Sequence, residues 1–160
     1  MKYPLFIVTG YSGSGKTTSA PLLGKLMPEF NVFDMDIIVN NQDFQTACNN
    51  WIRIAYSNAM CGRWTVLFGS VPNPFNISLS PKIEFFNPIH LLVLSCRDDI
   101  RYQRLIARGG WTVEGINHTN DAARLMYAQA TNNHICVIDT SDISPTQVVD
   151  YVRGWILEKL

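Results

Sequence analysis

The sequence has little charge and no long apolar run. Only 16% of its 160 residues are charged, and 13 basic side chains balance 13 acidic ones. A net charge of zero removes the long-range attraction by which broad nucleic-acid and anionic-membrane binders gather their partners. The longest apolar runs, such as residues 89–94, fall far short of the roughly 20 residues that a membrane-spanning helix needs. We therefore expect neither a membrane nor a nucleic acid as a partner.

A secretory signal and paired cysteines are also lacking. Residues 4–8 lead directly into a glycine-rich segment, without the longer apolar region and cleavage site of a signal peptide. The four cysteines form no Cys-x-x-Cys pair, so we expect reduced core thiols at Cys48, Cys61, Cys96 and Cys136. Both absences predict a cytoplasmic protein. Its charge-poor surface predicts cover by a ligand or by a second subunit, as in a homodimer.

Short apolar runs alternate with helical patterns along the whole chain. Continuous apolar runs that stop at polar or glycine residues are typical of buried parallel strands. We expect five such strands, over residues 5–9, 30–33, 65–68, 89–95 and 134–138. Helical spacing predicts helices over 17–27, 44–61, 98–108, 121–130 and 146–160. The alternation predicts one α/β domain over residues 1–160, with three layers (α/β/α) around a five-stranded parallel sheet.

The most specific motif is the segment Gly10–Thr17, which matches Gly-x-x-x-x-Gly-Lys-[Ser/Thr] in full. Glycines let consecutive backbone N–H groups turn toward a polyphosphate. Lys16 would place a cation between the β and γ phosphates, and Thr17 would offer its hydroxyl to Mg²⁺. We therefore expect ATP and Mg²⁺ as cofactors. The expected nucleotide-binding residues of this segment are Gly10, Ser12, Gly13, Ser14, Gly15, Lys16, Thr17 and Thr18.

With this loop at residue 10 of a short chain, the sequence resembles the small P-loop kinases, such as adenylate, shikimate and gluconate kinases. The resemblance covers most of the chain, and the loop is its one strongly diagnostic motif. It implies a P-loop NTPase fold of the nucleotide-kinase type, with a short lid around residues 104–120. The Phe-Arg-x-x-Glu of shikimate kinases and the Glu-Arg-Ser of deoxynucleoside kinases are absent, so neither substrate is supported. No acidic Walker B residue follows the apolar run 65–68.

Two carboxylates, Asp34 and Asp36, follow the second expected strand. In an extended segment, alternation sends both to the same side, and ligands of open α/β sheets bind beyond the carboxyl ends of the strands. The pair resembles the Asp-x-Asp element of shikimate-type kinases. By that resemblance, Asp34 holds a Mg²⁺-bound water, and Asp36 binds or deprotonates the acceptor hydroxyl. The alternative is that one aspartate caps the next helix.

Four arginines at spacings of four, three and four predict one basic helical face: Arg97, Arg101, Arg104 and Arg108. Repulsion among like charges is most easily offset by an anionic partner. Arg104 and Arg108 resemble the Arg-x-x-x-Arg that begins the lid of adenylate-kinase-like proteins. By that resemblance, Arg104 stacks on adenine and Arg108 offsets charge in the transition state. The alternative is a solvated face paired with acidic side chains.

The remaining candidates rest on position. The resemblance implies that the loop after the last strand passes over the adenine, with Asp139 and Thr140 as its nearest residues. Gly69, after the third expected strand, would let a substrate approach the backbone. Arg53 lies among aromatic residues and is a candidate acceptor ligand, whereas core packing is the alternative for neighbouring Trp51 and Tyr56.

Together these features predict an ATP- and Mg²⁺-dependent kinase that transfers the γ-phosphoryl group to a hydroxyl or phosphate of a small-molecule acceptor. Lys16, Asp36 and Arg108 are the expected catalytic residues. Two alternatives stay open: a 5′-end polynucleotide kinase, and a nucleotide-binding regulatory protein or slow NTPase.

Overall fold

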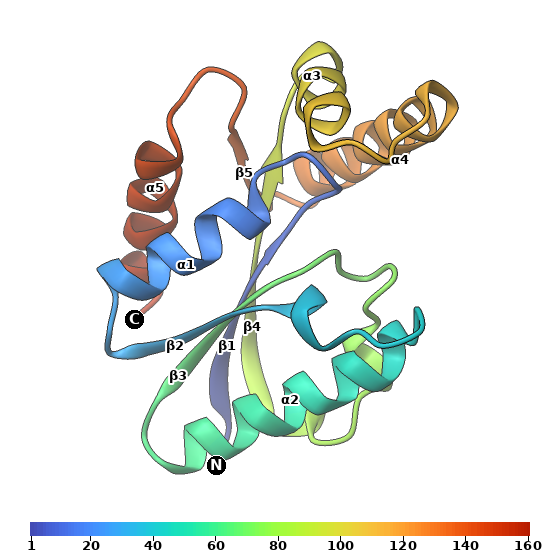
Figure 1. Ribbon diagram of the computed structural model, residues 1–160. Helices are drawn as coiled ribbons and strands as arrows, with labels where there is room; N and C mark the ends of the chain where they lie inside the picture. The colour runs from blue at the N-terminus through green and yellow to red at the C-terminus, as the bar shows by residue number, and fades with distance from the viewer.

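A five-stranded, all-parallel β-sheet forms the centre of the computed structural model, which describes residues 1–160 (Figure 1). The strand order is β2-β3-β1-β4-β5. The strands are β1 (Tyr3–Thr9), β2 (Phe30–Asp34), β3 (Trp64–Phe68), β4 (Phe86–Ser95) and β5 (Cys136–Asp139). The fold class expected from the sequence, a parallel α/β sheet of five strands, is thus confirmed.

Helices connect most of the strands and cover both faces of the sheet. The α-helices are α1 (Lys16–Leu26), α2 (Phe44–Met60), α3 (Asp98–Arg108), α4 (Val113–Asn132) and α5 (Pro145–Glu158). Three 3₁₀-helices complete the structure: η1 (Met35–Ile38), η2 (Ile77–Leu79) and η3 (Ile83–Phe85). None of the helices combines the length and the apolar character needed to cross a membrane.

Two separate cores pack against the two faces of the sheet. Side chains alternate along β1, so Phe6 and Val8 pack against α1 and α5, whereas Leu5 and Ile7 pack against α2. All four are fully buried, and burial of each such side chain contributes about 1.5–3 kcal/mol. Figure 1 shows α1 and α5 together on one side of the sheet and α2 on the other. The predicted three layers are therefore present.

Strand β1 lies in the middle of the sheet, and this position determines where a site can form. It pairs with β3 on one side, where Val8 is in register with Phe68, and with β4 on the other, where Val8 is in register with Leu92. From β1 the chain passes first to β2 and β3 on one side and then to β4 and β5 on the other. A crevice beyond the carboxyl ends of the strands forms at such a switch point. The glycine-rich loop leaves β1 at this crevice.

Several elements begin elsewhere than the sequence patterns indicate, and three of these differences have consequences for the fold. Helix α4 begins at Val113 and not at residue 121, because Thr112 caps it by accepting a hydrogen bond from the Gly115 backbone N–H at 3.0 Å. Strand β5 begins at Cys136 and not at residue 134, because His134 has a φ of 54°, which is left-handed turn geometry. Strand β4 begins three residues early, at Phe86.

All four cysteines are free, but only two lie in the core. Cys48 and Cys96 are buried, as expected. The expectation of a core position is wrong for Cys61 and Cys136, which are exposed. Cys61 follows the end of α2, and Cys136 opens the short edge strand β5, so both lie at the ends of elements, where packing is less complete than in the core.

Candidate active site

The loop between β1 and α1, residues 10–15, has the backbone geometry of a phosphate cradle. Gly10, Gly13 and Gly15 have φ values of 154°, 83° and 106°, in the region that favours glycine. A Cβ atom on Gly10 would lie 2.5 Å from the carbonyl oxygen of Leu94 in the neighbouring strand. At Gly15, by contrast, a Cβ atom would meet nothing within 4 Å, so the loop is open on that side. The structure thus holds a cradle that is closed toward the sheet and open toward α1.

The first turn of α1 presents free N–H groups to this opening. Its N-cap residue, Gly15, has no side chain to accept a hydrogen bond from them. The first backbone N–H to be satisfied within the helix is that of Ser19, which donates to the Gly15 carbonyl at 3.0 Å. The N–H groups of Lys16, Thr17 and Thr18 have no acceptor in the protein. Together with the helix dipole, they make this opening suited to an anion.

Lys16 is buried against the loop and has no carboxylate partner in direct contact. Its Nζ donates to the carbonyl oxygens of Gly10 and Tyr11, the latter at 3.2 Å. Burial lowers the pKa of Lys16 to about 8, while the charges of Asp36 and Asp34 act in the opposite direction. Because only carbonyl oxygens contact the ammonium group, its positive charge is available to a phosphate.

Asp34 and Asp36 lie at the end of β2, but not in the extended geometry expected from the sequence. β2 ends at Asp34, whose Oδ1 accepts a hydrogen bond from the Asp36 backbone N–H at 3.0 Å and so caps η1. The capping alternative is therefore correct for Asp34, and Asp36 stands in the first turn of a 3₁₀-helix. Capping competes with extended backbone wherever an aspartate precedes a free N–H group.

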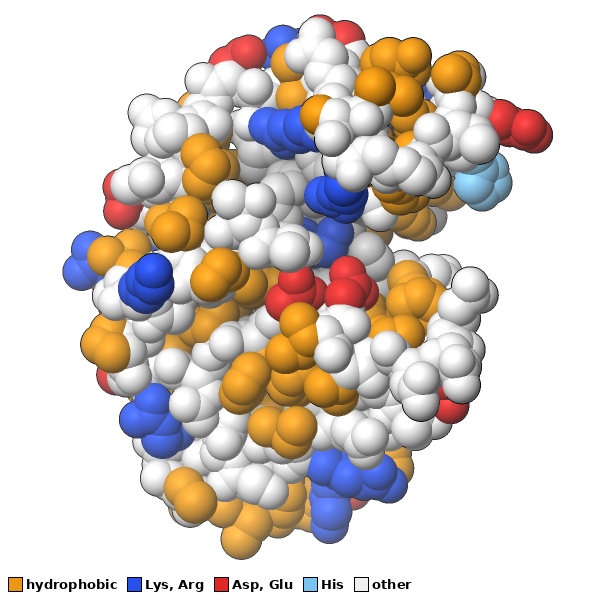
Figure 2. Space-filling model, viewed as in Figure 1, with side chains coloured by type: hydrophobic (Ala, Val, Ile, Leu, Met, Phe, Trp, Pro, Cys, Tyr) orange, Lys and Arg blue, Asp and Glu red, His pale blue; other side chains and the backbone are white.

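Electrostatic interactions connect both carboxylates with the loop and with α3. The pKa of Asp36 is raised, first by partial burial and then by the charge of Asp34, while Lys16 and Arg108 act to lower it. Lys16 is in turn influenced by Asp34, Asp36 and Arg108. Lys16 and Asp36 therefore each lie within electrostatic range of the other three residues. Figure 2 shows acidic side chains (red) beneath basic ones (blue) at the inner end of a hollow that opens to the right.

The arginines of α3 divide between the loop and the surface. Arg101 is almost completely buried and donates to the Ser12 carbonyl oxygen. Arg104 donates to the carbonyl oxygen of Gly13 at 2.9 Å. Arg97, the N-cap residue, instead forms ion pairs with Asp142 and Asp99, so the alternative of acidic pairing at the surface holds for this residue alone. Arg108, in the last turn, is exposed.

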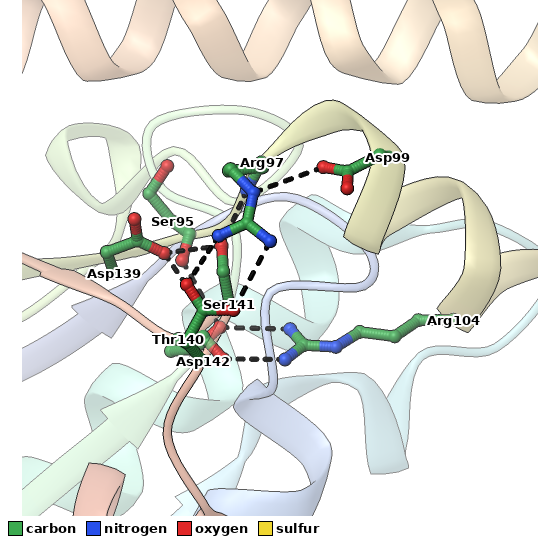
Figure 3. A network of polar contacts seen from close by, with 8 residues as sticks. All are labelled: Ser95, Arg97, Asp99, Arg104, Asp139, Thr140, Ser141 and Asp142. Carbon is green, nitrogen blue, oxygen red and sulfur yellow. Dashed lines mark hydrogen bonds and ion pairs between the residues drawn. The ribbon is translucent and has the colours of Figure 1, made fainter.

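A network around Thr140 joins α3 to the loop before α5 (Figure 3). The Arg104 guanidinium donates to the Thr140 hydroxyl at 2.9 Å and to its carbonyl oxygen at 2.7 Å. The Thr140 hydroxyl donates to the Ser14 carbonyl at 2.8 Å, and the Thr140 N–H donates to Ser95 at 2.8 Å. Asp139 instead accepts from the N–H and hydroxyl of Ser141. Thr140 therefore contacts the phosphate loop, whereas Asp139 stabilises the turn in which it lies.

A cavity of about 360 Å³ lies beside the cradle, between α1, α3 and the loop before α5. We call it the nucleotide cavity. Its lining includes six residues expected to bind nucleotide or catalyse transfer: Gly13, Gly15, Thr18, Arg104, Arg108 and Thr140. Ile143 and Val148 add an apolar wall. The sequence patterns did not indicate these two apolar residues, because nothing local distinguishes them from core positions.

For three of the expected site residues, the structure shows contacts of another kind. Arg53 is exposed on α2 and donates to Asn50 Oδ1 at 3.0 Å. Asp139 lines a different cavity, beside β5. Gly69 has a packing role, because a Cβ atom there would lie 2.5 Å from the Met35 sulfur. As ligands of substrate or nucleotide, all three stay predictions.

Core packing, the alternative for Trp51 and Tyr56, is observed. Trp51 is buried, donates to the Met35 carbonyl at 2.9 Å and packs against Phe33. Tyr56 packs against Tyr3 and Phe85. Arg53 therefore does not share an aromatic binding face with them.

Ser70 is a site residue that the sequence patterns missed. Its hydroxyl donates to the Gly10 carbonyl oxygen at 2.6 Å, the same oxygen that accepts from Lys16. Ser70 follows β3 closely, where many P-loop proteins carry an acidic residue, so the place was indicated but not the residue type. It supports the cradle from the side opposite α3.

Hard oxygen donors for a metal lie at the mouth of the cradle. No cluster of three or more His, Cys, Asp or Glu side chains that could hold a metal ion is present. Mg²⁺ in nucleotide sites, however, keeps several waters and takes only one or two protein oxygens besides the phosphates. The exposed Thr17 hydroxyl in the first turn of α1 and the Asp34 carboxylate suit that chemistry. The residues present therefore fit a phosphate-bound Mg²⁺.

Comparison with solved structures identifies the fold. The chain is similar to a sugar kinase from Janibacter sp. HTCC2649, with 16% identity, a TM-score of 0.65, and coverage of 98% of this chain and 95% of that chain. It is also similar to shikimate kinase from Acinetobacter baumannii in complex with shikimate, with 17% identity, a TM-score of 0.60, and coverage of 99% and 95%. An uncharacterized protein from Eubacterium ventriosum ATCC 27560 matches with 13% identity, a TM-score of 0.53, and coverage of 96% and 98%. No family model and no curated protein matches the sequence. The chain thus has the fold of the small P-loop kinases.

Proposed function

We propose that this protein is an ATP- and Mg²⁺-dependent kinase that transfers the γ-phosphoryl group to a small-molecule acceptor. The observation that carries the proposal is that Asp36 lies within electrostatic range of both Lys16 and Arg108 beside the glycine cradle. A cradle alone would suit any nucleotide-binding protein. A carboxylate near two cations adds a group that can accept a proton beside groups that stabilise phosphoryl charge.

In this proposal, the phosphates of ATP lie in the cradle and its base lies in the nucleotide cavity. The N–H groups of the first turn of α1 hold phosphate oxygens. The Arg104 N–H groups are engaged with Gly13 and Thr140, which leaves its planar face to lie against a purine. Ile143 and Val148 supply the apolar side of the base pocket.

Thr17 and Asp34 would hold Mg²⁺, the first through its hydroxyl and the second directly or through water. The bound ion would neutralise charge on the β and γ phosphates. Asp34 has a second task that needs no metal, because it caps η1 and thereby fixes the backbone that carries Asp36.

Transfer then takes place at the inner end of the hollow. The acceptor oxygen attacks the γ-phosphorus, the bond from that phosphorus to the bridging oxygen of ADP breaks, and the acceptor proton passes to the Asp36 carboxylate. The raised pKa of Asp36 makes it a better proton acceptor than an ordinary aspartate. Lys16 and Arg108 stabilise the charge on the transferred group.

The expected lid, residues 104–120, comprises the last turn of α3, a four-residue connection and the first part of α4. Its closure over bound nucleotide is part of the proposal. So are acceptor contacts from Arg53 and Gly69, a base contact from Asp139, a cytoplasmic location and a second subunit.

The test combines two variants with an acceptor screen. We expect ADP release from ATP·Mg²⁺ to rise above background with an acceptor, and we expect Lys16→Ala and Asp36→Asn each to abolish that rise. Nucleotide affinity, measured by calorimetry, should fall strongly in Lys16→Ala and stay within a few fold in Asp36→Asn. Loss of nucleotide binding in both variants would contradict the separate roles.

The same experiment addresses the open alternatives. Tight nucleotide binding with no acceptor-stimulated turnover would indicate a regulatory protein or slow NTPase. A steep salt dependence of oligonucleotide binding would indicate a polynucleotide kinase. The arginines of α3 favour the small-molecule acceptor, because Arg101 and Arg104 turn inward to the loop and form no basic surface for a nucleic acid.

A further inference from the structure

A second cavity, of about 490 Å³, adjoins the cradle on the face of the sheet covered by α4. We call it the α4 cavity. Leu91 and Val93 of β4 form its floor, the loop after β3 forms one wall through Val71 and Pro72, and α4 forms the other. Its volume falls within the range of small-molecule sites, roughly 300–1,000 Å³.

The lining of the α4 cavity carries no charge. Nine of its 14 residues are hydrophobic, and none is Lys, Arg, Asp, Glu or His. The polar groups with the greatest hydrogen-bonding capacity are neutral amides, those of Asn73, Gln129 and Asn133. An anionic ligand would lose its hydration here without gaining a cation, and such an unpaired charge is costly.

The two neighbouring cavities, unlike the α4 cavity, are lined by charged side chains. The nucleotide cavity contains two arginines, Arg104 and Arg108. The cavity beside β5 contains Arg97 and Arg124 together with acidic side chains. Those ionic linings suit charged ligands or internal ion pairs. The α4 cavity alone of the three combines hydrogen-bonding amides with an uncharged, mostly apolar wall.

The α4 cavity adjoins the loop that we assign to the phosphates. Thr9 and Tyr11, which flank Gly10, both line it. Tyr11 belongs to the loop, and its carbonyl accepts from Lys16 Nζ at 3.2 Å, although Lys16 itself does not line the cavity. The α4 cavity and the cradle therefore share a residue.

The wall next to the cradle is fixed in advance. The Thr9 hydroxyl donates to the Val71 carbonyl at 3.1 Å, and the Val71 N–H donates to the Thr9 hydroxyl oxygen at 2.9 Å. Ser70, the preceding residue, donates to Gly10. A preformed wall lowers the entropy cost of binding and is typical of small-molecule sites.

We propose that the α4 cavity holds the body of the phosphoryl acceptor, and that this acceptor is an uncharged alcohol with a partly apolar ring system. The inference rests on the proposed kinase function and narrows its substrate class. It disfavours carboxylate or phosphate acceptors, which find no cation in the cavity. It also disfavours small polyols, which would leave its apolar wall unfilled.

The test compares matched acceptors that differ in one property each. A nucleoside, its 5′-monophosphate and free ribose share the 2′ and 3′ hydroxyls, whereas only the first is both uncharged and joined to an aromatic base. An aryl glucoside, glucose and gluconate form a second such set, in which only the glucoside is uncharged and carries an aromatic ring. We expect kcat/KM for ADP release to be at least tenfold higher for the neutral member that carries the aromatic ring than for its partners. A preference for the anionic members or for the free sugars would overturn the inference.

A pair of α4 variants tests the cavity itself. Leu125 lines it and is 61% exposed, so Leu125→Arg places a cation at the cavity without disturbing the core. Tyr127, 50% exposed on the same helix, lines the cavity beside β5 and not the α4 cavity, and Tyr127→Arg is the control. We expect Leu125→Arg to raise KM for the preferred neutral acceptor at least tenfold and to leave ATP affinity unchanged. Tyr127→Arg should change neither value.

The outcomes separate the two proposals. If no acceptor of any class releases ADP above background, the kinase proposal fails. If charged acceptors or bare polyols turn over and neutral ring-bearing ones do not, the kinase proposal stands and the inference fails. If neutral acceptors turn over equally in both arginine variants, the acceptor does not occupy the α4 cavity, and that assignment fails.

Discussion

The guanidinium group of Arg101 donates a hydrogen bond to the carbonyl oxygen of Ser12, from a side chain that is only 1% exposed. No carboxylate forms an ion pair with it, and its Nε has no partner. Burial lowers its pKa, yet arginine remains protonated in proteins. A positive charge without an ion-pair partner therefore lies against the phosphate loop.

We expect Arg101→Met to weaken ATP binding about tenfold, equal to about 1.4 kcal/mol, because the loop loses both a charge and the donor that holds Ser12. Calorimetric titration with ATP measures this effect. The matched control is Arg97→Met, because Arg97 is exposed and its surface ion pair with Asp142 contributes little. Equal affinities in the two variants would show that Arg101 has no special effect on the nucleotide.

Lys16→Met should stabilise the protein while removing nucleotide binding. The pKa of Lys16 falls from 10.5 to about 8 on folding, so the unfolded chain binds more protons between these pH values. Burying the protonated lysine therefore lowers the free energy of unfolding. This cost is fully present below pH 8, at up to about 3 kcal/mol, and disappears as the pH rises toward 10.5. Lost hydrogen bonds to Gly10 and Tyr11 offset part of the gain. We expect a net gain of about 1–2 kcal/mol at pH 7.

Urea unfolding of both proteins at several pH values checks this prediction. The difference in free energy of unfolding between variant and wild type should shrink between pH 8 and pH 10. Other titrating groups, including the cysteines, contribute equally to both proteins and cancel in the comparison. If this difference in free energy stays constant with pH, Lys16 keeps its ordinary pKa.

Asp36 should govern the acidic side of the pH–activity profile. Its pKa lies above the ordinary value of 3.8, so kcat/KM should fall as the pH drops, with a midpoint above 3.8. A raised pKa in the folded state also means that the charged carboxylate opposes folding at neutral pH. Asp36→Asn should therefore raise the thermal midpoint while abolishing transfer. A lower midpoint would contradict the electrostatic account of Asp36.

Gly10→Ala should be severely destabilising. The residue has a φ of 154°, and the new Cβ atom would lie 2.5 Å from the backbone oxygen of Leu94, which cannot move without disturbing β4. We expect a loss of about 2 kcal/mol or more and no ATP binding. Gly154→Ala, within α5 and with nothing near its Cβ position, is the control and should gain about 0.5–1 kcal/mol. Thermal denaturation of the two variants measures both effects.

The parts of the structure that local physics determines could be predicted from the sequence. The cradle was predictable because its conformation depends on residues that are adjacent in the sequence: the glycines, Lys16 and the turn into α1. Strands β1 and β3 were predictable because central strands are buried on both faces and leave continuous apolar runs. The start of α4 was not, because one threonine cap at Thr112 outweighs the weak helix propensity of the following residues, Gly115 among them.

Features that depend on distant contacts could not be predicted in the same way. Arginine spacing placed Arg101 and Arg104 on one helical face, but it could not show that this face packs against the loop carbonyls of Ser12 and Gly13. The extended geometry expected for the Asp34–Asp36 segment was wrong, because the Asp34 side chain caps η1. The α4 cavity had no local signal at all, since its walls come from four separate parts of the chain.

The hydrogen bonds that join Arg104 and Thr140 to the phosphate loop determine how salt affects nucleotide binding. Every acceptor in these bonds is a carbonyl or a hydroxyl oxygen, and none carries a formal charge that mobile ions could screen. High ionic strength will therefore weaken the electrostatic attraction between exposed Arg108 and the triphosphate at salt concentrations that leave the hydrogen bonds of the base pocket intact. Adenosine, which lacks phosphates, should bind almost equally at low and high salt.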